Sequence, residues 1–185
     1  MAGGTDGQIL GWDAGGNPAA IGPGTDGQVL TSSGANTVAT FEAPAVGRPY
    51  YSVTGGNQNV SDAVDTKLTF SNETNDSDGC YNHTTHKFIP NKAGRYFIEA
   101  NIQFSPQGAD RFHSCIVYIY KNGSSYISIS EDDFNNYYSY SKGMSMSGIV
   151  PMNGTSDYIE IYGHLNVTTG SPQISGSVLG FFIGV

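Results

Sequence analysis

A twenty-residue repeat at the start of the chain limits what this sequence can fold into. Residues 4–10 read Gly-Thr-Asp-Gly-Gln-Ile-Leu, and residues 24–30 read Gly-Thr-Asp-Gly-Gln-Val-Leu. Each unit joins a Thr-Asp-Gly turn signal to a single two-residue apolar step, which is too little for one chain to build a core. We therefore expect either a flexible Gly-rich linker or a shaft in which three copies wind about a common axis and cover the apolar steps.

The repeat units resemble those of phage tail-fibre and other virion appendage proteins over residues 3–41. A connecting stretch with two prolines, residues 43–49, follows them, and proline disfavours both a helix and a central strand there. The predicted organisation is a Gly-rich shaft with two repeats and a linker at 1–47, followed by a head domain at 48–185. The resemblance implies a virion fibre that contacts other virion proteins through its N-terminal side.

The rest of the chain predicts strands, and no stretch of it has a helical period. Between residues 95 and 104, apolar side chains alternate with polar ones, which is typical of a half-buried strand. The side chains expected to face the core are Tyr96, Ile98, Ala100, Ile102 and Phe104.

Two hairpins are predicted from turn signals between apolar runs. The pair Asn122-Gly123 predicts a tight turn between strands at 116–120 and 126–130. A second hairpin is expected from 145–152 to 157–164, around an Asn-Gly-Thr-Ser sequence whose residues tolerate positive φ.

The last predicted strand differs from the others because both of its faces are apolar. One face fits the core of a β-sandwich and the other fits a subunit interface; the alternative is a strand buried on both faces inside one subunit. The candidate core or trimer-interface residues are Val178, Leu179, Phe181, Phe182 and Ile183.

The order of the strand signals resembles the globular head of the complement one-q family over about residues 60–185. The segments that carry the resemblance are 88–90, 93–97, 117–123, 147–150, 157–159 and 179–183. It implies an all-β fold, a ten-stranded jelly-roll sandwich of the tumour-necrosis-factor type, which assembles as a homotrimer. It also implies that both termini lie at one end of the head and the loops at the other.

Charge and composition exclude some classes of partner. The net charge is −8 with only eight Lys and Arg, so no basic surface is available to neutralise phosphates, and nucleic acid is not expected as a partner. The first residues have neither a basic segment nor an apolar run, so we expect no signal peptide, no membrane insertion and synthesis in the cytoplasm of a host bacterium. Cys80 and Cys115 are expected to be buried thiols.

No motif for catalysis is present, and we expect the protein not to be an enzyme. His83 and His86 are interpreted as solvated loop histidines, because no further ligand lies at a metal-binding spacing. No cofactor is expected. Calcium is the lesser alternative, and its weak candidate ligands are Asp76, Asp78, Asp132 and Asp133.

The segment from 132 to 148 has the composition of a binding loop, with Tyr for broad contacts and Asn, Ser and Gly for adaptable hydrogen bonds. The candidate receptor-binding residues are Asn135, Asn136, Tyr137 and Ser139. An equally weighted alternative makes Tyr138, Tyr140, Met144 and Met146 the inward face of a strand. Two functions follow: a trimeric adhesin for a bacterial surface glycan or protein, or a structural clamp or decorative knob without a ligand.

Overall fold

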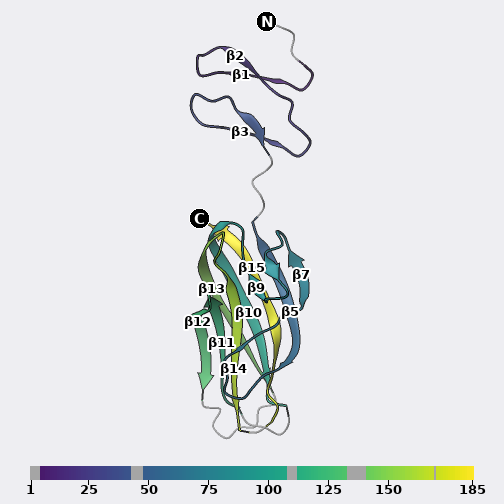
Figure 1. Ribbon diagram of the computed structural model, residues 1–185, viewed down its shortest axis with the longest axis vertical. Coiled ribbons are helices and arrows are strands. Elements are labelled where there is room, and N and C mark those ends of the chain that lie inside the picture. The colour runs from purple at the N-terminus through teal and green to yellow at the C-terminus, as the bar shows by residue number, and fades with distance from the viewer. Residues whose placement is uncertain (1–4, 43–47, 108–111, 133–140, 169) are drawn as a thin grey trace. The chain divides into compact units, whose positions relative to one another are not determined.

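The computed structural model describes residues 5–42, 48–107, 112–132, 141–168 and 170–185. The chain divides into two compact units, Met1–Gly47 and Arg48–Val185, which we call the repeat unit and the head unit (Figure 1). Strands are the only regular elements of the described residues, which contain no helix and therefore none long and apolar enough to cross a membrane.

The repeat unit contains two short antiparallel hairpins, one for each sequence repeat. Strand β1 (Ile9–Trp12) pairs with β2 (Pro18–Ile21), and β3 (Val29–Thr31) pairs with β4 (Thr40–Glu42). A hydrogen-bonded turn precedes each hairpin.

The repeated Thr-Asp-Gly-Gln sequence forms the same turn twice. The Gln28 N–H donates to the Thr25 carbonyl oxygen at 3.1 Å, and the Thr25 N–H donates to Gln28 Oε1 at 2.7 Å. Gln8 and Thr5 make the same two bonds at the same lengths. Gly27 has a φ of 83°, a backbone angle that residues other than glycine rarely adopt. The turn therefore uses the glycine for its backbone angle, and the threonine backbone and the glutamine side chain for its hydrogen bonds.

The head unit is a sandwich of two antiparallel sheets. The five-stranded sheet has the order β13-β10-β15-β5-β7, and the six-stranded sheet has the order β12-β11-β14-β9-β8, with β6 paired to β14. The strands of the first sheet are β5 (Tyr50–Asn59), β7 (Asn72–Asp76), β10 (Ala93–Ser105), β13 (Lys142–Asn153) and β15 (Gln173–Gly184). Those of the second sheet are β6 (Thr66–Lys67), β8 (Tyr81–Asn82), β9 (Lys87–Phe88), β11 (Phe112–Lys121), β12 (Ser124–Asp132) and β14 (Ile159–Val167).

The core between the two sheets is made by the alternating side chains of the long strands. The five residues predicted to face the core from β10 are all buried, and their neighbours across the sandwich include Val117, Ile119 and Leu165. This confirms the all-β sandwich. The described residues of the head form eleven strands where ten were expected, and three of them, β6, β8 and β9, have only two residues each. Cys80 and Cys115 are buried and unbridged, as expected.

The first predicted hairpin is correct and the second is wrong. Asn122 and Gly123, both with positive φ, connect β11 to β12 within one sheet. The turn after β13 leads instead to β14, which lies in the other sheet.

Side-chain bonds explain why the chain changes sheets at this second turn. The Asp157 carboxylate accepts the Asn153 N–H at 3.0 Å and the Asn122 Nδ2–H at 2.8 Å. The turn is thereby fastened to the tip of the β11–β12 hairpin, beside which β14 begins. An Asn-Gly turn signal favours a reversal of the chain but does not specify which sheet the next strand joins.

Candidate assembly and recognition surfaces

The terminal strand β15 presents two apolar faces with different surroundings. Val178 and Phe182 are buried in the core, where the Phe182 ring contacts the Tyr96 ring edge-on with centroids 5.4 Å apart. Leu179, Phe181 and Ile183 point to the opposite side of the sheet, and Phe181 is 42% exposed. Within a single chain, then, this strand buries one apolar face and leaves the other open.

The open face of β15 continues across the five-stranded sheet as a row of apolar side chains. Phe97 on β10 lies opposite both Ile149 on β13 and Phe181 on β15, and Phe181 lies opposite Tyr50 on β5. The Phe97 and Phe181 rings are in contact, with centroids 5.3 Å apart. Ile149 is 53% exposed and Tyr50 is 45% exposed. We call these four residues the apolar row.

The outer face of the six-stranded sheet has a different composition, with three tyrosines on neighbouring strands. Tyr118 and Tyr120 on β11 lie beside Tyr162 on β14, and the Tyr120 and Tyr162 rings stack with centroids 4.1 Å apart. Tyr118 meets Tyr120 edge-on at 5.7 Å. We call these residues the tyrosine cluster. All three are half-buried, so each presents part of its ring at the surface.

Charged groups border the tyrosine cluster on both sides. The Asp65 carboxylate lies 2.8 Å from His164 Nδ1. Burial, with the nearby Asp65 as a smaller cause, raises the pKa of Tyr118 to about 12. On the other side the buried Glu160 carboxylate is 3.2 Å from Lys67 Nζ, so its charge is paired. The cluster combines aromatic rings with hydrogen-bonding groups of both signs and no excess of positive charge.

The residues predicted to bind a receptor, Asn135, Asn136, Tyr137 and Ser139, lie outside the described residues, and so do Tyr138 and Tyr140 of the alternative interpretation. Met144 and Met146, which the same alternative placed on the inward face of a strand, are buried in the core from β13. The sequence analysis missed the tyrosine cluster. Its signal was the alternation of tyrosine with apolar residues along β11.

The two acidic residues considered for calcium whose side chains the structure describes, Asp76 and Asp78, differ in their hydrogen bonding. Asp76 uses both carboxylate oxygens to accept the N–H groups of Cys80 and Tyr81, at 2.9 Å and 2.7 Å. Asp78 has one buried oxygen without a hydrogen-bond partner among the described residues. Asp133 and the side chain of Asp132 lie outside the description. No group of three His, Cys, Asp or Glu side chains within the described ranges is arranged to hold a metal ion.

The two loop histidines also differ in their surroundings. His83 Nε2 lies 2.6 Å from Glu73 Oε2 at an exposed position. His86 has a positive φ and a buried Nδ1 for which the described residues supply no partner. The expectation of solvated loop histidines therefore fits the exposed His83, whereas His86 is half-buried with a buried Nδ1 atom.

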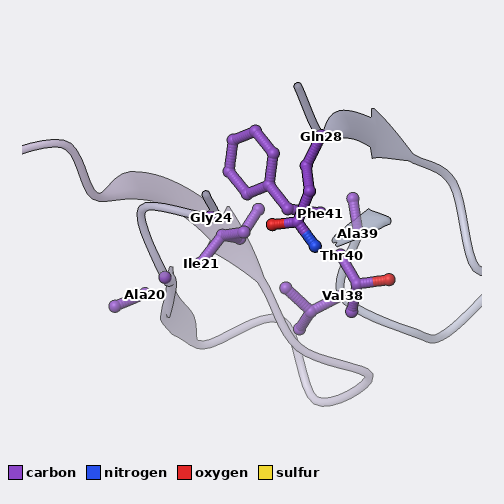
Figure 2. A pocket seen from close by; sticks show the side chains of 9 residues that line it. Ala20, Ile21, Gly24, Gln28, Val38, Ala39, Thr40 and Phe41 are labelled. Carbon is purple, nitrogen blue, oxygen red and sulfur yellow. The ribbon is translucent and has the colours of Figure 1, made fainter. Parts of the chain in front are cut away.

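The repeat unit contains an open pocket of about 410 Å³ (Figure 2). Ile21 from the first hairpin and Val38 and Phe41 from the second gather around it, and the remaining lining residues are uncharged. Gly24 lies directly against the Phe41 ring, where a Cβ atom would come within 2.8 Å of the ring carbon Cγ. A glycine is therefore needed at this position for the ring to lie against the backbone.

Comparison with known proteins gives a fold and no family. No family model matches the sequence, and no curated protein matches it. Among solved structures, the chain is similar to the globular domain of zebrafish complement 1qA protein, with a TM-score of 0.55 and 15% sequence identity. The similarity covers 73% of this chain and 97% of that chain.

The head has the complement 1q-like fold. This confirms the resemblance seen in the order of strand signals, although only 15% of the aligned residues are identical. What the two chains share is the arrangement of two antiparallel sheets around one core, and at that identity the likeness concerns the fold alone.

Proposed function

We propose that this chain is a homotrimeric fibre protein of a bacteriophage virion, whose head is the receptor-binding tip for a glycan or protein on the bacterial surface. The observation that carries the proposal is the apolar row on the five-stranded sheet. A row of Tyr50, Phe97, Ile149 and Phe181 that crosses four neighbouring strands near one end of the sheet is stabilised when a second copy covers it. The resemblance to complement one-q heads implies that three copies do so.

The fibre part of the proposal rests on the repeat unit. Its Thr-Asp-Gly-Gln turns resemble those of phage fibre repeats, and its apolar steps are exposed in a single chain. A linear array of such repeats gains stability only by contact with neighbours, whether in the same chain or in other copies. Residues 1–47 include no Lys or Arg, which argues against nucleic acid as the partner of the repeat unit.

The adhesin part rests on the tyrosine cluster, which belongs to the sheet opposite the apolar row. If the apolar row is covered in the trimer, each of the three copies presents its tyrosine cluster on the outside of the particle. Tyrosines bordered by Asp65, Glu160, Lys67 and His164 offer both flat contact area and hydrogen bonds, as ligand-binding surfaces do. Three weak sites on one particle give strong attachment by multivalency.

Binding of the purified full-length protein to cells of a host strain tests the proposal. Tyr162→Ala should reduce cell binding at least about tenfold, since aromatic anchors commonly contribute more than 1–2 kcal/mol each. Ser128→Ala, on the edge strand beside Tyr118, is the matched control and should bind normally. The triple change Asn135→Ala, Asn136→Ala and Tyr137→Ala tests the loop predicted from the sequence in the same assay.

The outcomes separate the adhesin from the structural alternative. Loss of binding with an unchanged melting temperature assigns the contact to the altered residues. Normal binding by every variant would remove both surfaces from the receptor site. No binding by the parent protein to any host strain would contradict the adhesin and favour a trimerisation clamp or decorative knob.

A further inference from the structure

The repeat unit leaves most of its large apolar side chains uncovered. Leu10 is 58% exposed and Trp12 is 63% exposed, and Ile9, Val29 and Leu30 are each more than 40% exposed. Ile21 is the one large apolar side chain buried among the described residues of this unit. Exposure of these side chains to water is unfavourable, and contact with another surface that covers them would be stabilising.

The pocket of Figure 2 has the lining that an apolar side chain needs. Ile21, Val38 and Phe41 form its walls, and no charged residue borders it. Its main polar neighbour is Gln28, whose Oε1 already accepts the Thr25 N–H. At about 410 Å³ the pocket lies in the range that takes small organic ligands, so an indole ring can enter it. The lack of charge disfavours an ionic ligand.

The same unit contains an exposed aromatic side chain, Trp12, that is of a kind to fit this pocket but does not line the pocket of its own chain. In the first hairpin Trp12 is paired with Pro18, whereas Ile21 of the pocket is paired with Ile9 at the other end of the strands. Trp12 is thus three residue pairs away from Ile21, it does not line the pocket of its own chain, and most of its surface is exposed to solvent. Trp12 is the single tryptophan of the chain, and the second repeat has Ser32 at the equivalent position.

We propose that Trp12 of one copy occupies the pocket formed by Ile21, Val38 and Phe41 of a neighbouring copy. Each copy has one Trp12 and one such pocket. Each copy therefore inserts its indole ring into one neighbour and accommodates the ring of another. The contact repeats around a closed ring of copies, and it fixes how the copies are aligned along the fibre. The inference rests on the proposed function, since it requires several copies side by side.

Fluorescence of the full-length protein tests this contact directly, because Trp12 is the only tryptophan. Its emission should be shifted to shorter wavelength, and acrylamide should quench it several-fold less than in the denatured protein. Val38→Asp places a charge in the pocket, so it should restore the long-wavelength emission and the quenching. Asn36→Asp is the control: it adds the same charge to the same hairpin at an exposed position with positive φ, which Asp tolerates.

Light scattering on the same samples separates the two proposals. A trimer with a protected Trp12 that Val38→Asp exposes supports the contact. A trimer in which Trp12 is freely quenched overturns the contact but leaves the trimer. A protected Trp12 that responds equally to Val38→Asp and Asn36→Asp, or not at all, also overturns it. A monomer contradicts both the contact and the proposed assembly.

Discussion

In the head unit, Tyr96, Ile98 and Phe104 are completely buried by residues of the same chain, whereas in the repeat unit Leu10 and Trp12 lie more than half in solvent. Both units are built from antiparallel strands with glycines in left-handed turns. The difference is that the head has two sheets to place face to face, while each repeat has one short hairpin. A hairpin alone cannot enclose a core, so we expect the repeat unit to depend on contacts with other copies more than the head does.

Strand β15 combines a buried apolar face and an exposed apolar face in one element. Its inward side chains complete the core of the head, and its outward side chains form part of the apolar row. The head is therefore expected to fold as a single chain and to associate through the face that this folding leaves open.

Removal of residues 178–185 should have the largest effect. It takes Val178 and Phe182 out of the core and removes more than half of β15, the strand that pairs with both β10 and β5. Burial of one such apolar side chain is worth about 1.5–3 kcal/mol, against a net domain stability of about 5–15 kcal/mol. We expect an aggregated product in circular dichroism and gel filtration. A folded, soluble monomer would show that β15 is peripheral to the core.

Two neighbouring phenylalanines provide a matched pair for the separation of folding from association. Phe182→Ala should destabilise the fold by about 3–5 kcal/mol, because its ring is buried against Tyr96. Phe181→Ala should leave the fold of the single chain nearly unchanged and weaken association, because its ring lies on the open face. Chemical denaturation and light scattering measure the two effects. Equal losses of stability would mean that the two faces of β15 are not distinct.

Gln28→Ala should have the smallest effect, confined to the repeat unit. It removes the side-chain oxygen that accepts the Thr25 N–H, a bond worth about 0.5–1.5 kcal/mol. Faster hydrogen exchange is expected at the Thr25 amide, while the melting of the head stays the same. Gln8→Ala is the matched variant and should act on the Thr5 amide. Altered melting of the head, or unchanged exchange at both amides, would contradict this account of the repeated motif.

Alternation along a strand was enough to predict the core of the head. Each of the five residues expected inward from β10 is buried, because a strand with one apolar face has only one way to lie on a core. The turn at Asn122-Gly123 was predictable for a similar reason, since few residues tolerate its backbone angles. The two-sheet sandwich itself was expected from the resemblance to complement one-q heads, and the similarity to the zebrafish complement 1qA globular domain supports that fold.

Contacts between distant parts of the sequence were not predictable in the same way. Asp157 directs the chain to the second sheet through Asn122, a residue thirty-five positions earlier. The tyrosine cluster likewise depends on Asp65, which comes from the loop before β6 and lies ninety-nine positions from its partner His164. In the repeat unit, the sequence showed which residues recur, but only the structure showed that the glutamine closes the turn.

The mass of the full-length protein in solution tests the central claim most directly. The claim is that the apolar row and the exposed steps of the repeat unit are covered by two further copies of the chain. Light scattering at micromolar concentration should give three times 19.6 kDa. A single monodisperse species of 19.6 kDa would contradict the account, because the exposed apolar surfaces of both units would then be stable in water without a partner.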